Sequence, residues 1–129
     1  MNKYLAAAGA ISFVVGFLHS ALGETMIFRR MRSKSFIPTN GGRVIGEGHV
    51  RIIWASWHVL TVFGWLIGAA LVWLAAMPVQ LQNQGTLLTV IAAAMLVNSA
   101  LVFIATKGRH PGWVGLLAVA ALTWLGQGT

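Results

Sequence analysis

Long apolar runs with almost no charge constrain this chain more than any other feature of its sequence. Four such runs cover residues 4–28, 52–77, 87–106 and 113–127. A helix needs about 20 apolar residues to cross a bilayer, and the first three runs reach this length. The fourth is shorter, so its helix would tilt little, thin the bilayer or lean on partner helices. The sequence therefore predicts an all-α, four-transmembrane-helix bundle in a single domain, residues 1–129.

The composition requires an environment other than water. Of 129 residues, 57% are hydrophobic and 9% are charged, whereas a soluble domain carries about 25% charged residues. So few charges cannot cover a water-facing surface, and we expect the excess apolar surface to face lipid. The chain has no cysteine, which excludes disulfides, thiolate metal sites and iron–sulfur clusters.

The charges between the apolar runs predict the orientation. Six basic residues and only one acidic residue lie between the first two runs, none lies in residues 78–86, and Lys107, Arg109 and His110 lie in the third connection. The positive-inside rule then places the first and third loops in the cytoplasm and both termini outside. The net charge is +7, but no nucleic-acid-binding motif is present. We therefore expect anionic lipid headgroups, and no nucleic acid, to meet the first-loop cations Arg29, Arg30, Arg32, Lys34 and Arg43.

Small residues recur every four positions along the first run. This stripe consists of Ala8, Ser12, Gly16 and Ser20, and its next step is Glu24. The second run contains Gly64 and Gly68 in a G-x-x-x-G arrangement. Such stripes let helix backbones approach closely in lipid. We expect them to pack within the chain, with a homo-oligomer or a larger membrane complex as the alternative.

Polar side chains gather at one depth of the predicted bundle. His19, His58 and Asn98 each lie about two helical turns from the cytoplasmic end of their helix. A charged group at mid-membrane costs at least about 2.5–3.5 kcal/mol, so such residues usually face the bundle interior and carry function. We therefore predict a site at these three residues. Glu24 lies nearer the helix end, where it would pair with an arginine of the first loop.

Three kinds of ligand fit this predicted site. Haem b would take His19 and His58 as axial ligands, with Arg43 or Arg51 pairing with the propionates. A divalent metal ion would take His19, Glu24 and His58, with His49 or His110 as a substitute. A quinone would accept a hydrogen bond from a histidine and lie against Trp54. No tight ligand motif such as H-x-x-H or H-E-x-x-H is present. In the alternative interpretation, the polar residues only bond one another and fix the helix register.

The sequence HSALGE at residues 19–24, followed by Trp57-His58 on the next run, resembles a pattern in uncharacterised bacterial four-helix integral membrane proteins. The resemblance covers the first two helices best and brings no known activity. It implies a bacterial inner membrane. In size and helix number the chain is also similar to small multidrug transporters, which work as dimers around a glutamate in their first helix. Glu24 would match that glutamate, but it lies near the helix end, and the first loop is longer and more basic than in those transporters.

These observations leave three functions open. The leading hypothesis is a membrane protein that binds a ligand or cofactor inside the membrane, with or without catalysis. The second is a non-catalytic accessory or assembly subunit of a membrane complex. The third is a small proton-coupled transporter.

Overall fold

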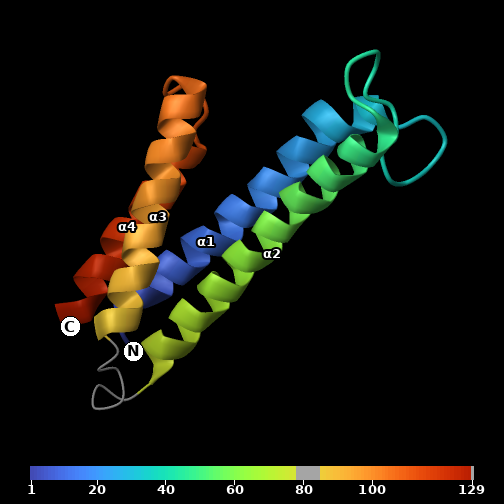
Figure 1. Ribbon diagram of the computed structural model, residues 1–129. Coiled ribbons are helices and arrows are strands. Elements are labelled where there is room, and N and C mark those ends of the chain that lie inside the picture. The colour runs from blue at the N-terminus through green and yellow to red at the C-terminus, as the bar shows by residue number, and fades with distance from the viewer. Residues whose placement is uncertain (78–84, 129) are drawn as a thin grey trace. The chain divides into compact units, whose positions relative to one another are not determined.

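The computed structural model describes residues 1–77 and 85–128, and these form four α-helices and no β-strand. The helices are α1 (Lys3–Leu22), α2 (Glu47–Ala76), α3 (Gly85–Thr106) and α4 (Gly112–Leu125) (Figure 1). The predicted all-α fold is confirmed. The helical stretch that begins with α1, together with α2 and α3, is long and apolar enough to cross a membrane, whereas α4 is shorter. Most of the predicted neutral second loop falls on residues 78–84, outside the described residues.

Two boundaries differ from those predicted by three or more residues, and the others lie within two residues of the prediction. Helix α2 begins at Glu47, five residues before the apolar run at 52. A carboxylate in the first turn interacts favourably with the positive end of the helix dipole, and Glu47 also pairs with Arg51 one turn later. At the other boundary, α1 continues as a π-helix, η1 (Gly23–Ile27), and then as a 3-10 helix, η2 (Phe28–Met31). The first helical stretch thus continues three residues beyond the end of its apolar run.

The chain divides into two compact units. The first unit comprises Met1–Val15 and Gly64–Thr129, and the second comprises Gly16–Phe63. Helices α1 and α2 therefore contribute to both units, whereas α3 and α4 belong wholly to the first.

The first unit has an aliphatic core. Its buried residues come from all four helices: Leu5, Ala8, Leu71, Leu74, Ala75, Leu88, Ile91, Met95, Val119 and Ala120. Asn2 ties the ends of two helices together. Its side-chain oxygen accepts hydrogen bonds from the backbone N–H groups of Tyr4 and Leu5 and so caps α1, while its amide nitrogen donates to the carbonyl of Gly126 at 2.8 Å.

Small residues bring α1 and α2 into close contact within the first unit. A Cβ atom at Gly9 would lie 2.6 Å from the carbonyl oxygen of Gly68 and 2.6 Å from the Val72 side chain. One turn further along α1, the Ser12 hydroxyl donates to the carbonyl of Gly64 at 2.8 Å. Ser12 of the predicted stripe thus contacts α2 within the chain, whereas the closest approach is made by Gly9, which lies one position away from the stripe.

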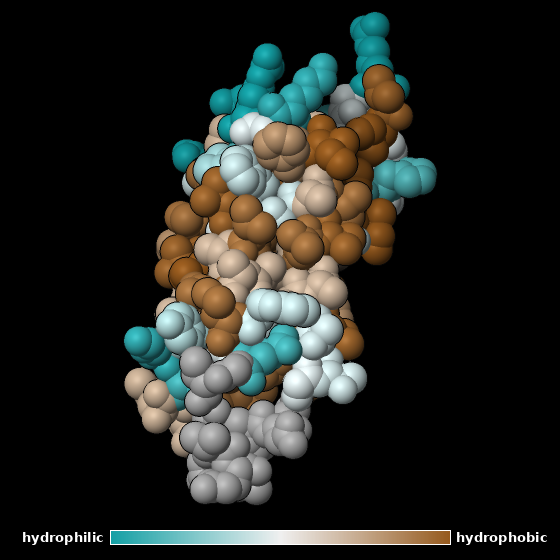
Figure 2. All heavy atoms as spheres, turned by 90° about the vertical axis from the view of Figure 1, so that its left-hand side faces the viewer, coloured by the Kyte–Doolittle hydropathy of each residue, from teal (hydrophilic) through white to brown (hydrophobic). Residues whose placement is uncertain are grey.

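Apolar side chains dominate the outside of the helices. Phe17, Leu60 and Ile104 are 64%, 63% and 72% exposed, respectively. On the face shown in Figure 2, hydrophobic side chains (brown) form a broad band between more hydrophilic ones (teal). Such a surface is the one that lipid chains solvate and water does not.

Residues with positive φ allow the chain to turn in the two basic connections, at Gly42 in the first and at Lys107 and Gly108 in the third. The segment at residues 38–42 forms a turn, in which Gly42 adopts φ +70° and its N–H donates to the Asn40 side chain at 3.0 Å. Helix α3 ends where Lys107 and Gly108 adopt φ of 52° and 72°. The N–H of Gly108 then donates to the carbonyl of Phe103 at 2.8 Å, which closes a Schellman motif.

Candidate functional site: a carboxylate–imidazole network

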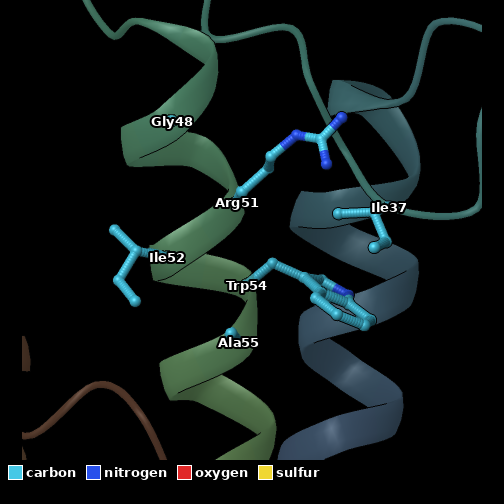
Figure 3. Close-up of a pocket in the computed structure, with 6 residues that line it drawn as sticks. All are labelled: Ile37, Gly48, Arg51, Ile52, Trp54 and Ala55. Atoms are coloured by element: carbon cyan, nitrogen blue, oxygen red, sulfur yellow. The ribbon is translucent and has the colours of Figure 1, made fainter.

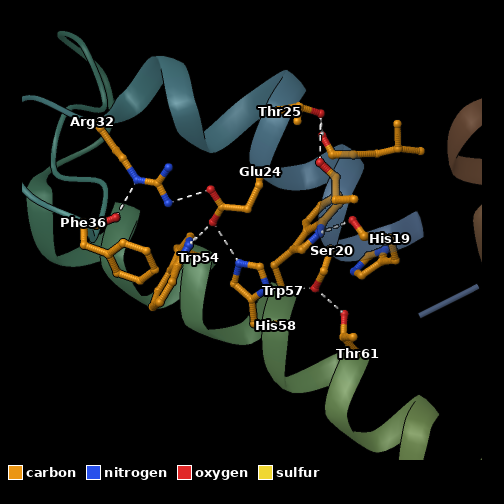
Figure 4. Close-up of polar contacts among 12 residues, drawn as sticks. His19, Ser20, Glu24, Thr25, Arg32, Phe36, Trp54, Trp57, His58 and Thr61 are labelled. Carbon is orange, nitrogen blue, oxygen red and sulfur yellow. Dashed lines mark hydrogen bonds and ion pairs between the residues drawn. The ribbon is translucent and has the colours of Figure 1, made fainter. Parts of the chain in front are cut away.

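The site lies in the second unit, where one face of α1 and η1 meets one face of α2. Ser20 and Glu24 lie one turn apart on the first face, and Trp54, His58 and Thr61 follow the same spacing on the second. Their polar groups point toward one another (Figure 4). Together with Arg32 of the first loop, these residues are the polar network.

Glu24 is the centre of the polar network. Its Oε1 atom accepts a hydrogen bond from the Trp54 indole at 2.7 Å and lies 3.1 Å from His58 Nε2. Its Oε2 atom accepts a hydrogen bond from the Arg32 guanidinium at 2.6 Å. The Arg32 contact confirms the prediction that Glu24 pairs with an arginine of the first loop. Two groups from α2 and one from the first loop thus converge on one half-buried carboxylate.

His58 extends the polar network away from the carboxylate. Its Nδ1 atom lies 2.8 Å from the Ser20 hydroxyl, which lies 2.8 Å from the hydroxyl of Thr61. Thr61 is buried. Imidazole and hydroxyl groups can each donate and accept. A continuous hydrogen-bonded path therefore runs from Arg32 through Glu24, His58 and Ser20 to Thr61.

His19 lies beside this path. Its ring stacks on the Trp57 indole with centroids 4.3 Å apart and planes 7° apart. The Trp57 N–H in turn donates to the backbone carbonyl of His19 at 3.0 Å. The structure thus brings both predicted histidines into the second unit but gives them different partners: an aromatic ring for His19, and a carboxylate and a hydroxyl for His58.

The π-helix η1 carries Glu24, and local contacts explain its position. Gly23 packs so closely against Trp57 that a side chain there would collide with the indole. The hydroxyl of Thr25 donates to the carbonyl of Ala21 at 2.8 Å, a bond that competes with the regular helical pattern. Such π segments are rare and often occur at functional sites. The irregular backbone therefore occurs at Glu24, the centre of the polar network.

Arg51 and Trp54 were predicted to touch a cofactor. Trp54 donates to Glu24, as described, and its ring meets Phe36 edge-on with centroids 5.9 Å apart. Arg51 pairs with Glu47 at 2.8 Å, and both side chains are half exposed. The other predicted member, Asn98, lies exposed on α3 in the first unit. Its meeting with the histidines stays a prediction.

The geometry does not support the predicted metal and haem ligands. Within residues 1–77 and 85–128, no group of three or more His, Asp or Glu side chains could hold a metal ion. Both ring nitrogens of His58 lie within hydrogen-bond distance of Ser20 or Glu24. An iron or zinc ion could bind His58 only after one of these contacts broke.

Some members of the polar network were harder to find from the sequence. Arg32 was grouped with the headgroup-binding cations, yet it is half buried and bound to Glu24. The other cations of that group, Arg29, Arg30, Lys34 and Arg43, are exposed. The small-residue stripe could have identified two members of the polar network in advance. Its four-residue spacing includes Ser20 and continues to Glu24, and it does not include His19.

Comparisons with known proteins add no further assignment. No family model matches the chain, and no curated protein or solved structure matches it. The resemblance to bacterial four-helix membrane proteins therefore stays a prediction.

Proposed function

We propose that this protein is an integral membrane protein of the bacterial inner membrane with a proton-exchange site near its cytoplasmic face. The single observation that carries this proposal is the 3.1 Å contact between the Glu24 carboxylate and His58, continued by Ser20 and Thr61. Ionisable residues inside membrane helices are costly, and chains of Asp, Glu and His side chains are one way in which they serve function, as proton relays. An imidazole changes its charge near neutral pH more readily than any other side chain.

The order of groups along the path suits proton exchange with one side of the membrane. Arg32 and Glu24 lie at the end nearest the basic first loop, and the buried hydroxyl of Thr61 lies at the other end. A proton that reaches Glu24 can pass to His58, which can release its second ring proton toward Ser20. The network would therefore load a proton from the cytoplasm for a proton-coupled step.

A second function is favoured by a specific observation. Both oxygens of Glu24 and both ring nitrogens of His58 have protein partners. A fully satisfied network fixes helix register, which suits a non-catalytic accessory or assembly subunit. The two functions differ in one respect: a proton-exchange site takes up and releases protons in the folded protein, whereas a register clamp does not.

The test is a titration of the two carboxylates, for which this chain is well suited because Glu24 and Glu47 are its only acidic side chains. Protein labelled with ¹³C-glutamate and ¹⁵N-histidine would be placed in lipid vesicles and followed by solid-state NMR across pH. The control variant Glu47→Gln leaves one glutamate signal, that of Glu24. Proton exchange predicts that the Glu24 and His58 signals shift together and that Glu24→Gln changes the His58 transition.

Two results would overturn the proposal. One is a His58 transition that Glu24→Gln leaves unchanged, because the two groups would then not share a proton. The other is the absence of any Glu24 or His58 transition before the protein unfolds, which would favour the register clamp. The cytoplasmic assignment has its own test: reporter fusions after Gln82 and Gly108 should report outside and inside, respectively.

A further inference from the structure

A shallow pocket opens beside Trp54 in the second unit. Its volume is about 350 Å³, and it is bordered by Ile37 of the first loop and by residues of α2 (Figure 3): Gly48, Arg51, Ile52, Trp54 and Ala55. The border is almost wholly apolar, and Arg51 is the one charged residue among the six that line it. The pocket thus combines hydrocarbon contacts with a positive charge at its rim.

The positive charge around this pocket exceeds what the chain itself neutralises. The second unit carries six Lys and Arg side chains, and the whole sequence has only two acidic side chains. Glu24 is bound by Arg32, and Glu47 is bound by Arg51. No further acidic side chain remains for the exposed cations Arg29, Arg30, Lys34 and Arg43. Their counter-charge has to come from outside the chain.

Arg51 retains the means to bind an anion in addition to Glu47. It donates to Glu47 through Nε at 2.9 Å and through Nη2 at 2.8 Å. A guanidinium has five N–H donors in a planar fork, so donors remain for a phosphate oxygen. The side chain is 50% exposed, which leaves it accessible at the rim.

We propose that this pocket binds one anionic phospholipid. The phosphate lies against Arg51, and the glycerol and first methylene groups lie against Ile37, Ile52 and Ala55. Ligand pockets usually measure about 300–1,000 Å³, so this one accommodates the head end of a lipid and not its full length. The acyl chains continue along the outside of α2, where Ile52 and Val59 are exposed.

The position of the pocket along α2 suits this occupant. It lies in the first two turns, where the basic loop ends and the apolar run begins. Tryptophan rings favour this depth of a bilayer. Trp54 borders the pocket with its ring and donates its N–H to Glu24. The phospholipid proposal does not rest on the proton-exchange proposal, because it depends on Arg51 and the apolar border alone.

Native mass spectrometry of the full-length protein tests the proposal. The protein would be released from nanodiscs of equal parts phosphatidylglycerol and phosphatidylcholine with the same acyl chains. We expect one phosphatidylglycerol to be retained preferentially. Arg51→Gln should reduce this preference about fivefold, which corresponds to about 1 kcal/mol for one basic residue near an anionic surface. Arg51→Lys should retain most of it, because the charge is kept.

One single variant and one matched pair separate the pocket from its surroundings. Glu47→Gln removes the partner of Arg51 but leaves the guanidinium, so binding should be unchanged or stronger. Ala55→Trp fills the pocket and should abolish retention, whereas Ser56→Trp, at the neighbouring exposed position, should not. Circular dichroism of each variant checks that its helices are formed.

Several outcomes would overturn the proposal. One is equal retention of the two lipids by the wild type. Another is equal loss in Ala55→Trp and Ser56→Trp, which would indicate a diffuse lipid layer. Displacement of the lipid by excess inorganic phosphate would indicate a phosphate-ion site that does not recognise the lipid. If Arg51→Gln fails to fold, weak retention by Arg51→Lys contradicts the proposal in its place.

Discussion

Helices α1 and α2 pack against each other with opposite chemistry in the two units. In the first unit the contact is made by Gly9 and Gly68, whose backbones lie against each other. In the second it is made by Ser20, Glu24 and His58, whose side chains bond across the interface. Between helices in lipid, apolar burial gives little driving force, and close packing and hydrogen bonds supply it. The glycine contact depends on close packing alone, whereas the polar network also contains side chains that can gain or lose a proton.

The largest effect is expected in the polar network, from Glu24→Ala. This change removes the acceptor shared by Trp54, His58 and Arg32. Leaving half-buried donors without an acceptor costs about 3 kcal/mol of unfolding free energy. The measurement is unfolding by sodium dodecyl sulfate in mixed micelles, followed by far-UV circular dichroism.

A double-mutant cycle shows whether this loss belongs to the network. Glu24→Ala and His58→Ala should be non-additive by at least about 0.5 kcal/mol, as for groups in direct contact. Additive losses would mean that Glu24 and His58 act separately. The claim that a coupled polar network holds α1 and α2 together in the second unit would then be wrong.

The second largest effect is expected at the glycine contact of the first unit. In Gly9→Ala, the new methyl group meets the backbone of Gly68 and the side chain of Val72. Overpacking of this kind costs about 2 kcal/mol, measured in the same micelle titration. Gly64→Ala is the matched control, because a methyl group there has no neighbour within 4 Å. Equal losses in both variants would show that the glycines matter for some reason other than contact.

The sequence was sufficient to predict the parts of the fold that follow from the length of the apolar runs and the spacing of the small residues. Apolar runs gave the four helices, and the four-residue stripe gave the face of α1 that meets α2. The depth of His19 and His58 could be counted from the helix ends. Their common depth was therefore predictable before their contacts were known.

The direction of individual side chains was less predictable. His19 precedes Ser20 by one residue, which is about 100° around a helix of 3.6 residues per turn, so a shared depth did not put it on the shared face. The partner of Glu24 depended on η1 and η2, which change the rotation per residue between Glu24 and Arg32. At the start of η1, Gly23 packs closely on Trp57, and a hydrophobic periodicity does not predict such a contact.

A smaller effect is expected from Ser20→Ala. The variant removes the hydroxyl between His58 and Thr61 but leaves Glu24 with all its partners. A buried hydrogen bond of this kind contributes about 1 kcal/mol. Ser56→Ala, at an exposed position of α2, should change stability by less than the error of the titration. A loss at Ser20 as large as that in Glu24→Ala would move the centre of the network from the carboxylate to the hydroxyl.

The smallest effect is expected from Glu47→Gln, which breaks the second ion pair of this unit. Its chemistry matches that of the Glu24–Arg32 pair, but Glu47 and Arg51 are 58% and 50% exposed, against 27% and 24% for Glu24 and Arg32. Exposed pairs contribute about 0–1 kcal/mol and are screened by salt. The loss should therefore be small in low salt and vanish at high ionic strength, whereas the loss in Glu24→Gln should persist. If both losses responded equally to salt, burial would not distinguish the two carboxylates, and the special role of Glu24 would have to rest on His58 alone.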